Sequence, residues 1–491
     1  MIGLGALLLI ALTSALLFAY GANLLYLSWR AATLPAPAPT VSSIGAQPLV
    51  AVQIPIYNER YVAQRVIDAV ARLDWPADRL EIQVLDDSDD ETVELVAERV
   101  AHWGSRGIRI THVRRPGRAG YKAGALGHGL GLTHAALVAI FDADFVPPAD
   151  FLRRAVPALA DPRVGFVQAR WGHLNESYSW LTRVQAMTID FHFLVEQPVR
   201  ISRRFFTNFT GTAGIWRRAA IEEAGGWSDA TLTEDLDLSY RAQLRGWQAA
   251  YMEDLVVPQE LPVSLIAYRR QQARWATGSF QCARLLLPEI FTASLPLRVK
   301  WQALIHLCSY SVPLLVLVQV ACYPLLLASH GTGRAGAIAL PVFVNFMSLA
   351  PLVAFSVAQH RRGRHWWQGT AALVCQLVGA GLSVTIAGAL VRAFKRGGEF
   401  QRTPKYRIER RGQSWRQGAY GVGGDRFAFV ELAFGSVAAV LAAAEVGSGQ
   451  LLMSVYSALV ATGFLYMAGI GLAQSLAPFG LGPWLRGKST T

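Results

Sequence analysis

The sequence has little charge and little cysteine for a chain of its length. Only 16% of its 491 residues are charged, whereas 52% are hydrophobic. The cysteines show no metal-ligand spacing, and most of them lie in apolar runs. We therefore expect buried free thiols, consistent with a reducing cytoplasm for the soluble part. The four cysteines are Cys282, Cys308, Cys322 and Cys375.

The sequence also lacks the interleaved basic and aromatic residues of a nucleic-acid recognition module, although its net charge is +12. Its lysines and arginines gather beside hydrophobic segments, at residues 361–364 and 392–416. This distribution is the positive-inside signature of membrane proteins, and it also favours contact with anionic lipid. We therefore predict a lipid bilayer, and no nucleic acid, as a partner.

Charge is almost absent from residues 1–28 and from much of 301–478, whereas residues 46–300 have an ordinary globular composition. Uncharged stretches of about twenty residues predict membrane helices. The first stretch has no basic n-region, so we expect a retained transmembrane helix at 1–30 and not a cleaved signal peptide. A stiff proline- and alanine-rich linker follows at 31–46.

The C-terminal part, residues 299–480, is predicted to be a transmembrane region with a cytosolic loop at 395–425. Basic residues flank the apolar segment 369–393 on both sides, which favours a re-entrant or interfacial helical pair there. An ordinary span is the alternative. We expect no charged residue inside the apolar segments to mark an ion path, and so neither a channel nor a transporter. The apolar segments are 302–328, 336–358, 369–393, 427–446 and 451–475.

Between residues 47 and 298, strand-like and helix-like segments alternate. This βαβαβ rhythm predicts a cytosolic α/β domain, Rossmann-like, with a mostly parallel sheet and helices on both faces. Polar clusters follow successive strands, at the edge where open α/β sheets bind ligands. The expected strands are 49–54, 80–85, 108–113, 138–141 and 165–171.

The fourth predicted strand runs directly into Asp142 and Asp144. Residues i and i+2 of a strand point to the same side, so both carboxylates can face one point of the crevice. Two hard oxygen ligands suit Mg²⁺ or Mn²⁺, which also holds substrate phosphates. Because Asp-x-Asp is common in solvated turns as well, the metal interpretation depends on the neighbouring motifs.

Other polar residues follow the remaining strands. Asp86 and Asp87 can hydrogen-bond a base or a ribose, or they simply begin a helix. Lys122 lies among glycines and suits a diphosphate, although its surroundings are not a phosphate-loop motif. Gly211 and Thr212 belong to a loop of small residues, where the backbone can approach a sugar or a phosphate closely.

Two more motifs lie further along the domain. Glu234 and Asp235 begin a predicted helix, and acids in a first turn can be explained by the helix dipole alone. Gln271, Arg274 and Trp275 are spaced i, i+3, i+4 and share one helix face. A guanidinium suits phosphate, and an indole face suits a pyranose ring. An amphipathic juxtamembrane helix is the alternative interpretation.

The ordered set of motifs resembles the family-2 inverting glycosyltransferases of the cellulose synthase and hyaluronan synthase type. The set comprises Pro55-Ile-Tyr57-Asn-Glu59, the double aspartate after the second strand, Asp-x-Asp, Thr-Glu-Asp and Gln-x-x-Arg-Trp. It is more similar still to the plant cellulose-synthase-like A and C proteins, which make β-1,4-linked mannan, glucomannan or glucan. That closer resemblance includes Gly120-Tyr-Lys-Ala-Gly-Ala-Leu126, Val167-Gln-Ala-Arg-Trp171 and Gly398-Glu-Phe-Gln-Arg-Thr-Pro-Lys405.

The resemblance implies a GT-A-type fold and a role for each matching residue. Asp235, with Glu234 beside it, would provide the general base, and Asp142 and Asp144 would hold Mg²⁺ or Mn²⁺. One-step inversion needs such a base and a cation on the leaving diphosphate. The implied donor contacts are Pro55, Tyr57, Glu59, Asp86, Asp87, Lys122, Asp142, Gln271 and Arg274. The implied acceptor contacts are Trp275, Gln168, Trp171, Gly211 and Thr212.

We therefore expect a processive hexosyltransferase that polymerises β-linked mannan, glucomannan or glucan from GDP-mannose or UDP-glucose, which the motifs do not distinguish. The resemblance implies a multi-pass protein of the plasma (inner) membrane with a cytoplasmic catalytic domain. The enzyme would extend a growing glycan and pass it across the membrane, and loop 395–425 would act as a gate. The alternative is a non-processive enzyme that glycosylates a membrane lipid. A degenerate glycan-binding protein is disfavoured, because every expected acid is present.

Overall fold

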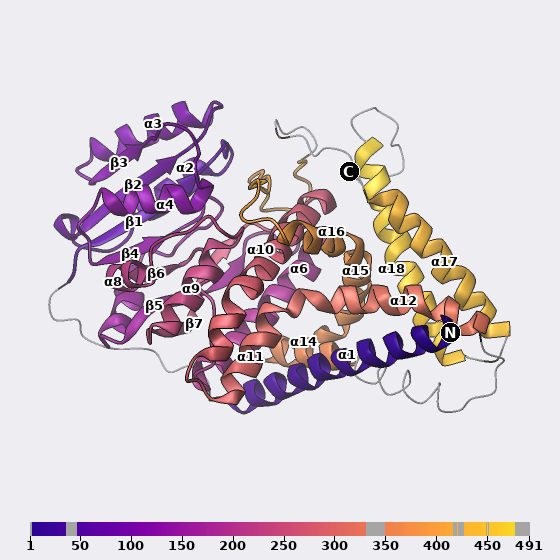
Figure 1. Ribbon diagram of the computed structural model, residues 1–491. Helices are drawn as coiled ribbons and strands as arrows, with labels where there is room; N and C mark the ends of the chain where they lie inside the picture. Colours follow the sequence, from indigo (N-terminus) through magenta and orange to yellow (C-terminus); the bar gives the residue numbers. More distant parts are fainter. Residues whose placement is uncertain are drawn as a thin grey trace.

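In the computed structural model, an α/β domain and a helical region lie side by side, with helix α10 (Leu265–Thr292) at their border (Figure 1). The structure describes residues 2–35, 47–329, 349–415, 420, 427–447, 449 and 451–476. Most of the predicted linker 31–46, the first part of the apolar segment 336–358 and part of loop 395–425 lie outside these residues.

The α/β domain is built on a seven-stranded sheet of order β3-β2-β1-β4-β6-β5-β7. Strands β1 to β4 are parallel, β6 runs antiparallel to both of its neighbours, and β7 is parallel to β5. The mostly parallel α/β sheet expected from the sequence is therefore confirmed. The strands are β1 Val50–Ile56, β2 Leu80–Asp86, β3 Ile110–Val113, β4 Leu137–Ile140, β5 Val164–His173, β6 Gly214–Arg217 and β7 Gln248–Gln259.

Each face of the sheet is covered by its own apolar cluster. Leu137 and Ala139 of β4 pack in one cluster with α2 and α5, whereas Val138 and Ile140 pack in another with α4, α8 and α9. This division follows from the alternation of side chains along a strand. The helices of the domain are α2 Ala63–Val70, α3 Thr92–Gly104, α4 Tyr121–Gly131, α5 Phe151–Ala155, α6 Trp180–Phe191, α7 Gln197–Ser202, α8 Arg218–Glu223 and α9 Glu234–Leu244. Short 3-10 turns lie at Ala77–Arg79 and Val156–Leu159, and a π-helical turn lies at His192–Glu196.

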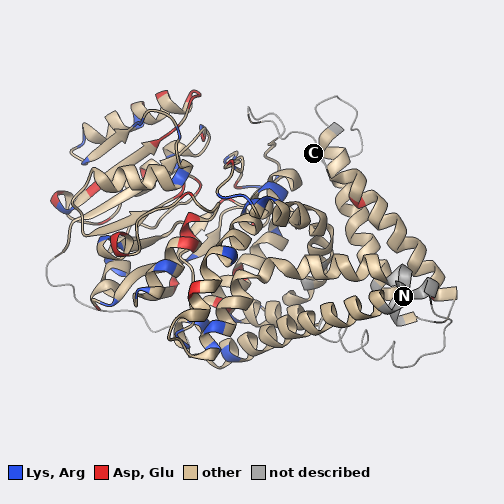
Figure 2. Ribbon diagram, in the orientation of Figure 1, with Lys and Arg blue, Asp and Glu red and all other residues tan. Residues whose placement is uncertain are grey.

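In the described residues, three helical stretches are long and apolar enough to cross a membrane: Gly5–Thr33, Ala428–Gly447 and Ser457–Ser475. Figure 2 shows that charged residues gather on the α/β domain and at its border, and are sparse along these helices. The helices of this region are α1 Ile2–Thr33, α11 Leu297–Leu307, α12 Val312–Ser329, α14 Ala350–Arg361, α15 Ala372–Gly381, α16 Ser383–Ala393, α17 Ala428–Gly447 and α18 Leu451–Leu476. Two 3-10 turns lie at Ser309–Ser311 and Trp366–Ala371.

Two further pairs of helices are long and apolar enough to cross a membrane only if the two helices of a pair are counted as one. The pair 297–307 and 309–322 bends by 49°, and the pair 366–381 and 383–393 bends by 50°. The described residues therefore hold up to five spans if each pair is one span. The second pair covers the segment 369–393, for which we predicted a helical pair. A break of this kind belongs to a broken span or a re-entrant loop.

The apolar segment 427–446 carries two acids. Glu431 and Glu445 lie within α17, and both are buried. Glu431 forms an ion pair with Arg269 of α10 at 2.6 Å, with exposed side-chain fractions of 0% and 4%. Glu431 therefore links α17 to α10, because the guanidinium of Arg269 neutralises its charge.

We predict that Arg269→Met destabilises the protein by about 3–5 kcal/mol, because it leaves the Glu431 carboxylate buried without this cation. The measurement is thermal unfolding of the detergent-solubilised protein. The double variant Arg269→Met/Glu431→Leu is expected to recover most of the loss. Asp74→Asn is the control, since it removes an exposed pair with Arg153 and is expected to leave unfolding unchanged. A single Arg269→Met variant as stable as the original protein contradicts this account.

Candidate active site

A polar pocket opens beyond the carboxyl ends of β1, β2 and β4, between the sheet and α10. It brings together nearly all of the residues that the sequence pointed to, although they come from positions 55 to 275. The predicted residues that line it are Pro55, Tyr57, Glu59, Asp87, Lys122, Asp142, Asp144, Trp171, Gly211, Glu234, Asp235, Gln271, Arg274 and Trp275.

Three predicted residues lie behind the wall of this pocket. Asp86 is buried, with its Oδ2 atom 2.8 Å from Nε2 of His112. The amide of Gln168 donates to the backbone oxygen of Thr212 at 3.0 Å, and the Thr212 hydroxyl accepts from the backbone N–H of Asp142 at 2.8 Å. These side chains hold the wall in place, so in this structure they position the residues that face the pocket.

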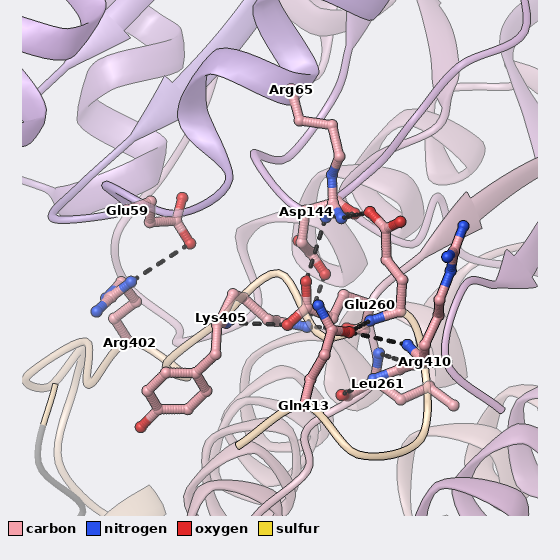
Figure 3. A network of polar contacts seen from close by, with 12 residues as sticks. Glu59, Arg65, Asp144, Glu260, Leu261, Arg402, Lys405, Arg410 and Gln413 are labelled. Atoms are coloured by element: carbon pink, nitrogen blue, oxygen red, sulfur yellow. Dashed lines mark hydrogen bonds and ion pairs between the residues drawn. The ribbon is translucent and has the colours of Figure 1, made fainter. Parts of the chain in front are cut away.

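The two acids of the Asp-x-Asp motif, Asp142 and Asp144, lie directly after β4. Each of these motif acids contacts a lysine. Nζ of Lys122 is 2.6 Å from Asp142, and Nζ of Lys405 is 2.6 Å from Asp144 (Figure 3). Burial raises the pKa of Asp142, against the opposing charge of Lys122. Burial by itself would lower the pKa of Lys122, but Asp142 and Glu234 together hold it above its ordinary value.

Asp235 is a largely buried carboxylate of the pocket whose pKa is raised. Burial, with the charge of Glu234 added, raises its pKa to about 7, while Lys122 opposes the shift. The carboxylate lies against Gly211, whose φ is +80° and where an added Cβ would be 2.8 Å from Oδ2 of Asp235. Glycine adopts this conformation without strain and has no side chain to clash with the carboxylate, so the loop fixes the position of Asp235.

Helix α10 presents Gln271, Arg274 and Trp275 to the pocket, as their spacing predicted. Gly278, one turn further on, packs directly against Thr233, the residue before the acidic pair, with no room for a Cβ. The border helix therefore contacts both the pocket and the start of α9.

Arg118, in the lining of the pocket, was not singled out from the sequence. Arg118 lies over the ring of Tyr57, 3.3 Å from its centroid. The segment after α16 also contributes to the lining, by Phe400, Arg402, Thr403 and Lys405. The resemblance had indicated that loop 395–425 lies near the site, but it gave no role to these side chains. For Arg118 the only signal is a basic residue close to the glycines before Lys122.

The carboxylates of the pocket can hold a divalent cation that substrate phosphates also bind. In the part of the chain that the structure describes, no group of three or more His, Cys, Asp or Glu side chains is arranged to hold a metal. Asp142 and Asp144 nevertheless supply two carboxylates at the pocket. Mg²⁺ is ordinarily bound by one or two carboxylates together with substrate phosphates, so a third protein ligand is not required.

Residues 47–278 match the family model described as "Glycosyltransferase like family 2". Glucomannan 4-beta-mannosyltransferase 2 of Arabidopsis thaliana is 51% identical over 248 residues, which are 50% of this chain and 46% of the relative. Glucomannan 4-beta-mannosyltransferase 1 of Oryza sativa subsp. japonica is 48% identical over 250 residues, which are 50% of this chain and 48% of the relative. The chain thus spans about half the length of the curated relatives it matches.

A solved structure resembles much of the chain in its fold. It is the mannosyltransferase PcManGT from Pyrobaculum calidifontis in complex with GDP-Man and Mn2+, with a TM-score of 0.54 and 21% identity. The match covers 79% of this chain and 99% of that one. The likeness confirms the GT-A fold expected for the domain.

Proposed function

Since residues 47–278 form a family-2 glycosyltransferase domain, we propose that the protein is a membrane-embedded, processive 4-β-mannosyltransferase. It would build a mannan or glucomannan backbone from GDP-mannose. The donor and the linkage are favoured by the plant relatives, which are named glucomannan 4-beta-mannosyltransferases. The observation that carries the proposal is the convergence of Asp235, the two motif acids and the α10 face on one pocket.

The chemistry starts at Asp235. Its carboxylate takes the proton of the acceptor hydroxyl, whose oxygen then attacks the anomeric carbon of the donor as the bond to the diphosphate breaks. The attack comes from the side opposite to the leaving group, so the configuration at the anomeric carbon inverts. Lys122 and Arg274 line the same pocket and supply positive charge to the diphosphate.

Asp142 and Asp144 are the residues that would hold a divalent cation, Mg²⁺ or Mn²⁺. When bound, the cation polarises the diphosphate and stabilises its leaving charge. The PcManGT complex, which contains Mn2+, is in keeping with this choice of metal. Trp275 and Trp171, also in the lining, offer indole surface to the sugars of the acceptor.

The membrane role is part of the same proposal. The domain is joined through α10 to helices that are long and apolar enough to span a bilayer, and these would pass the growing chain outward from the cytoplasmic side of the plasma membrane. The basic residues beside the apolar segments favour that orientation.

The pKa of Asp235 predicts a pH dependence. The base acts only as the carboxylate, so protonation removes activity as the pH falls through its pKa. We expect kcat/KM for the donor to be constant at high pH and to fall tenfold per pH unit below about 7. The measurement is the initial rate of mannose transfer at low donor concentration over a series of buffers. A profile that stays flat down to pH 5 contradicts the role of Asp235 as base.

The direct test uses the purified chain in detergent with Mn²⁺ or Mg²⁺. Radiolabelled GDP-mannose and UDP-glucose are offered separately, and the product is sized and digested. The proposal predicts an insoluble polymer from GDP-mannose that β-mannanase degrades. A polymer made only from UDP-glucose and degraded by cellulase overturns the donor assignment. A single sugar on a co-purified lipid overturns processivity and favours the non-processive alternative.

A further inference from the structure

An apolar cavity lies inside the helical region, apart from the active-site pocket. Its volume is about 510 Å³, within the range of ordinary ligand pockets. Its wall is formed by α1, α11, α12, α14, α15 and α18, together with the end of α6, and α1 and α12 run alongside each other there (Figure 1). In the part of the chain that the structure describes, no residue lines both this cavity and the active-site pocket. The proposed sugar transfer therefore does not account for this cavity.

The cavity has the length of a lipid chain. It follows one face of α1, formed by Leu17, Tyr20, Leu24 and Leu27. From the first to the last of these residues the helix rises about 15 Å, which is half of the hydrocarbon core of a typical bilayer. Each leaflet fills half of that core. Since α1 is itself long and apolar enough to cross a membrane, the cavity is about as long as one acyl chain of the surrounding lipid.

The lining is mostly apolar, and its polar side chains along α1 and α12 already have partners in the protein. The hydroxyl of Tyr20 donates to the backbone oxygen of Cys308 at 2.8 Å. The side-chain amide of Gln319 donates to the hydroxyl of Ser14 at 3.0 Å. These bonds fix the polar groups against the wall, so the cavity presents mainly hydrocarbon surface to a ligand.

Two ionisable residues of the lining lie at the end of the cavity near the α/β domain. Nδ1 of His306 is 2.7 Å from the hydroxyl of Tyr240, and Nδ1 of His192 is 2.9 Å from the carboxylate of Glu196. The guanidinium of Arg200 lies 3.6 Å from the same carboxylate. Because the charge of Glu196 is compensated within the protein, this residue requires no cation from a ligand.

This lining selects hydrocarbon over the other candidate occupants. A sugar chain would bury hydroxyl groups beside apolar side chains, and each hydroxyl without a hydrogen-bond partner costs free energy. A buried water molecule likewise needs two to four polar partners. An acyl chain needs no such partner, and it gains close van der Waals contact with the wall.

We propose that this cavity is a lipid site that takes one acyl chain of a membrane phospholipid. The chain packs between α1, α12 and α15 and fastens these helices to the end of α6 in the α/β domain. The inference goes beyond the proposed function, since the lipid is neither the donor nor the acceptor of the sugar.

Gly379 of α15 makes the proposal testable. It lines the cavity, and an added Cβ there has no neighbour within 4 Å. A larger side chain at this position therefore enters the cavity without striking the backbone. Gly469 of α18 provides the matched control, because an added Cβ there also has no neighbour within 4 Å, although the residue lies outside the lining.

The test is native mass spectrometry of the full chain, purified in a mild detergent and supplied with dioleoyl phosphatidylcholine. The original chain is expected to retain one phospholipid after the detergent is removed. Gly379→Phe is expected to lower the retained fraction about tenfold, because its ring overpacks the space that the acyl chain fills. Gly469→Phe is expected to retain the lipid as the original chain does.

A second pair of variants fills the cavity from the opposite wall. Leu24→Trp is expected to lose the lipid as Gly379→Phe does. Leu16→Trp is its control, because Leu16 lies on the same helix, is 43% exposed and does not line the cavity. This pair keeps the test decisive if Gly379→Phe does not fold.

Thermal unfolding shows which part of the lipid is bound. A ligand that binds only the folded chain raises Tm by mass action. Lysophosphatidylcholine, which has one acyl chain, is expected to raise the Tm of the original chain and of both controls more than that of the two filled variants. Glycerophosphocholine, which has the headgroup and no acyl chain, is expected to leave Tm unchanged. A rise with glycerophosphocholine overturns the proposal.

Equal lipid retention by Gly379→Phe and Gly469→Phe also overturns the proposal. A polymer shortened by Gly379→Phe, with lipid retention unchanged, would assign the cavity to the growing glycan and overturn it as well. Lipid retention is measured without donor. Absence of transfer from GDP-mannose therefore overturns the proposed function and leaves the lipid site in place.

Discussion

Asp235→Asn is expected to lower kcat for mannose transfer by about 10³-fold, because it replaces the base by an amide that cannot take a proton. The substitution is isosteric and removes neither a motif acid nor a lysine of the pocket. The N–H of Leu236 donates to Oδ1 of Asp235 at 2.9 Å, and the amide oxygen of Asn can accept the same bond. Donor binding and thermal unfolding are therefore expected to stay close to those of the original chain.

The control for this variant lies two residues further on. Asp237 is also a buried acid of α9, but it pairs with Arg241 and does not line the pocket. Asp237→Asn is expected to lower stability and to leave the rate of transfer per folded molecule unchanged. The rates come from single-turnover assays with labelled donor, and donor affinity from equilibrium binding. Near-normal turnover in Asp235→Asn would exclude this residue as the base.

Gly211→Ala is expected to lower kcat by about 10²-fold, since a methyl group there displaces the base by roughly an ångström. An added Cβ would lie 2.8 Å from Oδ2 of Asp235 and 3.3 Å from Nζ of Lys122. Both groups must shift, and the proposed mechanism uses both at the reacting centre. The φ of +80° adds a strain of about 1–2 kcal/mol for any residue with a side chain.

Gly246→Ala is the control that separates backbone strain at a positive φ from the contact of an added Cβ with Asp235. Gly246 has a φ of +95°, but an added Cβ there has no neighbour within 4 Å. This variant is expected to lose a similar amount of stability and to keep its kcat. If Gly211→Ala and Gly246→Ala lose activity equally, the close approach of the loop to Asp235 is without consequence for catalysis.

The sequence predicted the strands β1 to β5 and missed β6 and β7. The central strand β4 was found because a short apolar run ends abruptly in acids. Strand β6, Gly214–Arg217, was missed because it continues a loop of small residues, and β7 was missed because two acids interrupt its apolar residues, most of which are only partly buried. These two strands are determined by their partners in the sheet and not by their own pattern.

The double aspartate shows the limit of local pattern at the site. Neighbouring residues of a strand point to opposite faces, so only one of Asp86 and Asp87 can face the pocket. The structure directs Asp87 to the pocket, with a bidentate pair to Arg115, and buries Asp86 behind it. Strand alternation could have predicted the division, but not which acid would face the ligand.

The contacts of Lys405 could not be predicted from local pattern at all. Its partners are Asp144 and Glu260, far away in the sequence, and they meet only because the chain returns from the membrane side to the domain. The resemblance indicated a loop near the site. The ion pairs that hold this loop follow from tertiary structure alone.

The anomeric configuration of the transferred mannose tests the central claim most directly. The account has one carboxylate base and a single displacement, which turns the α-linked mannose of GDP-mannose into a β-linked residue. Nuclear magnetic resonance of the product made by the purified chain measures this configuration. β-Linked mannose is the predicted result. α-Linked mannose would require retention, and so a nucleophile and a second displacement that contradict the assignment of Asp235.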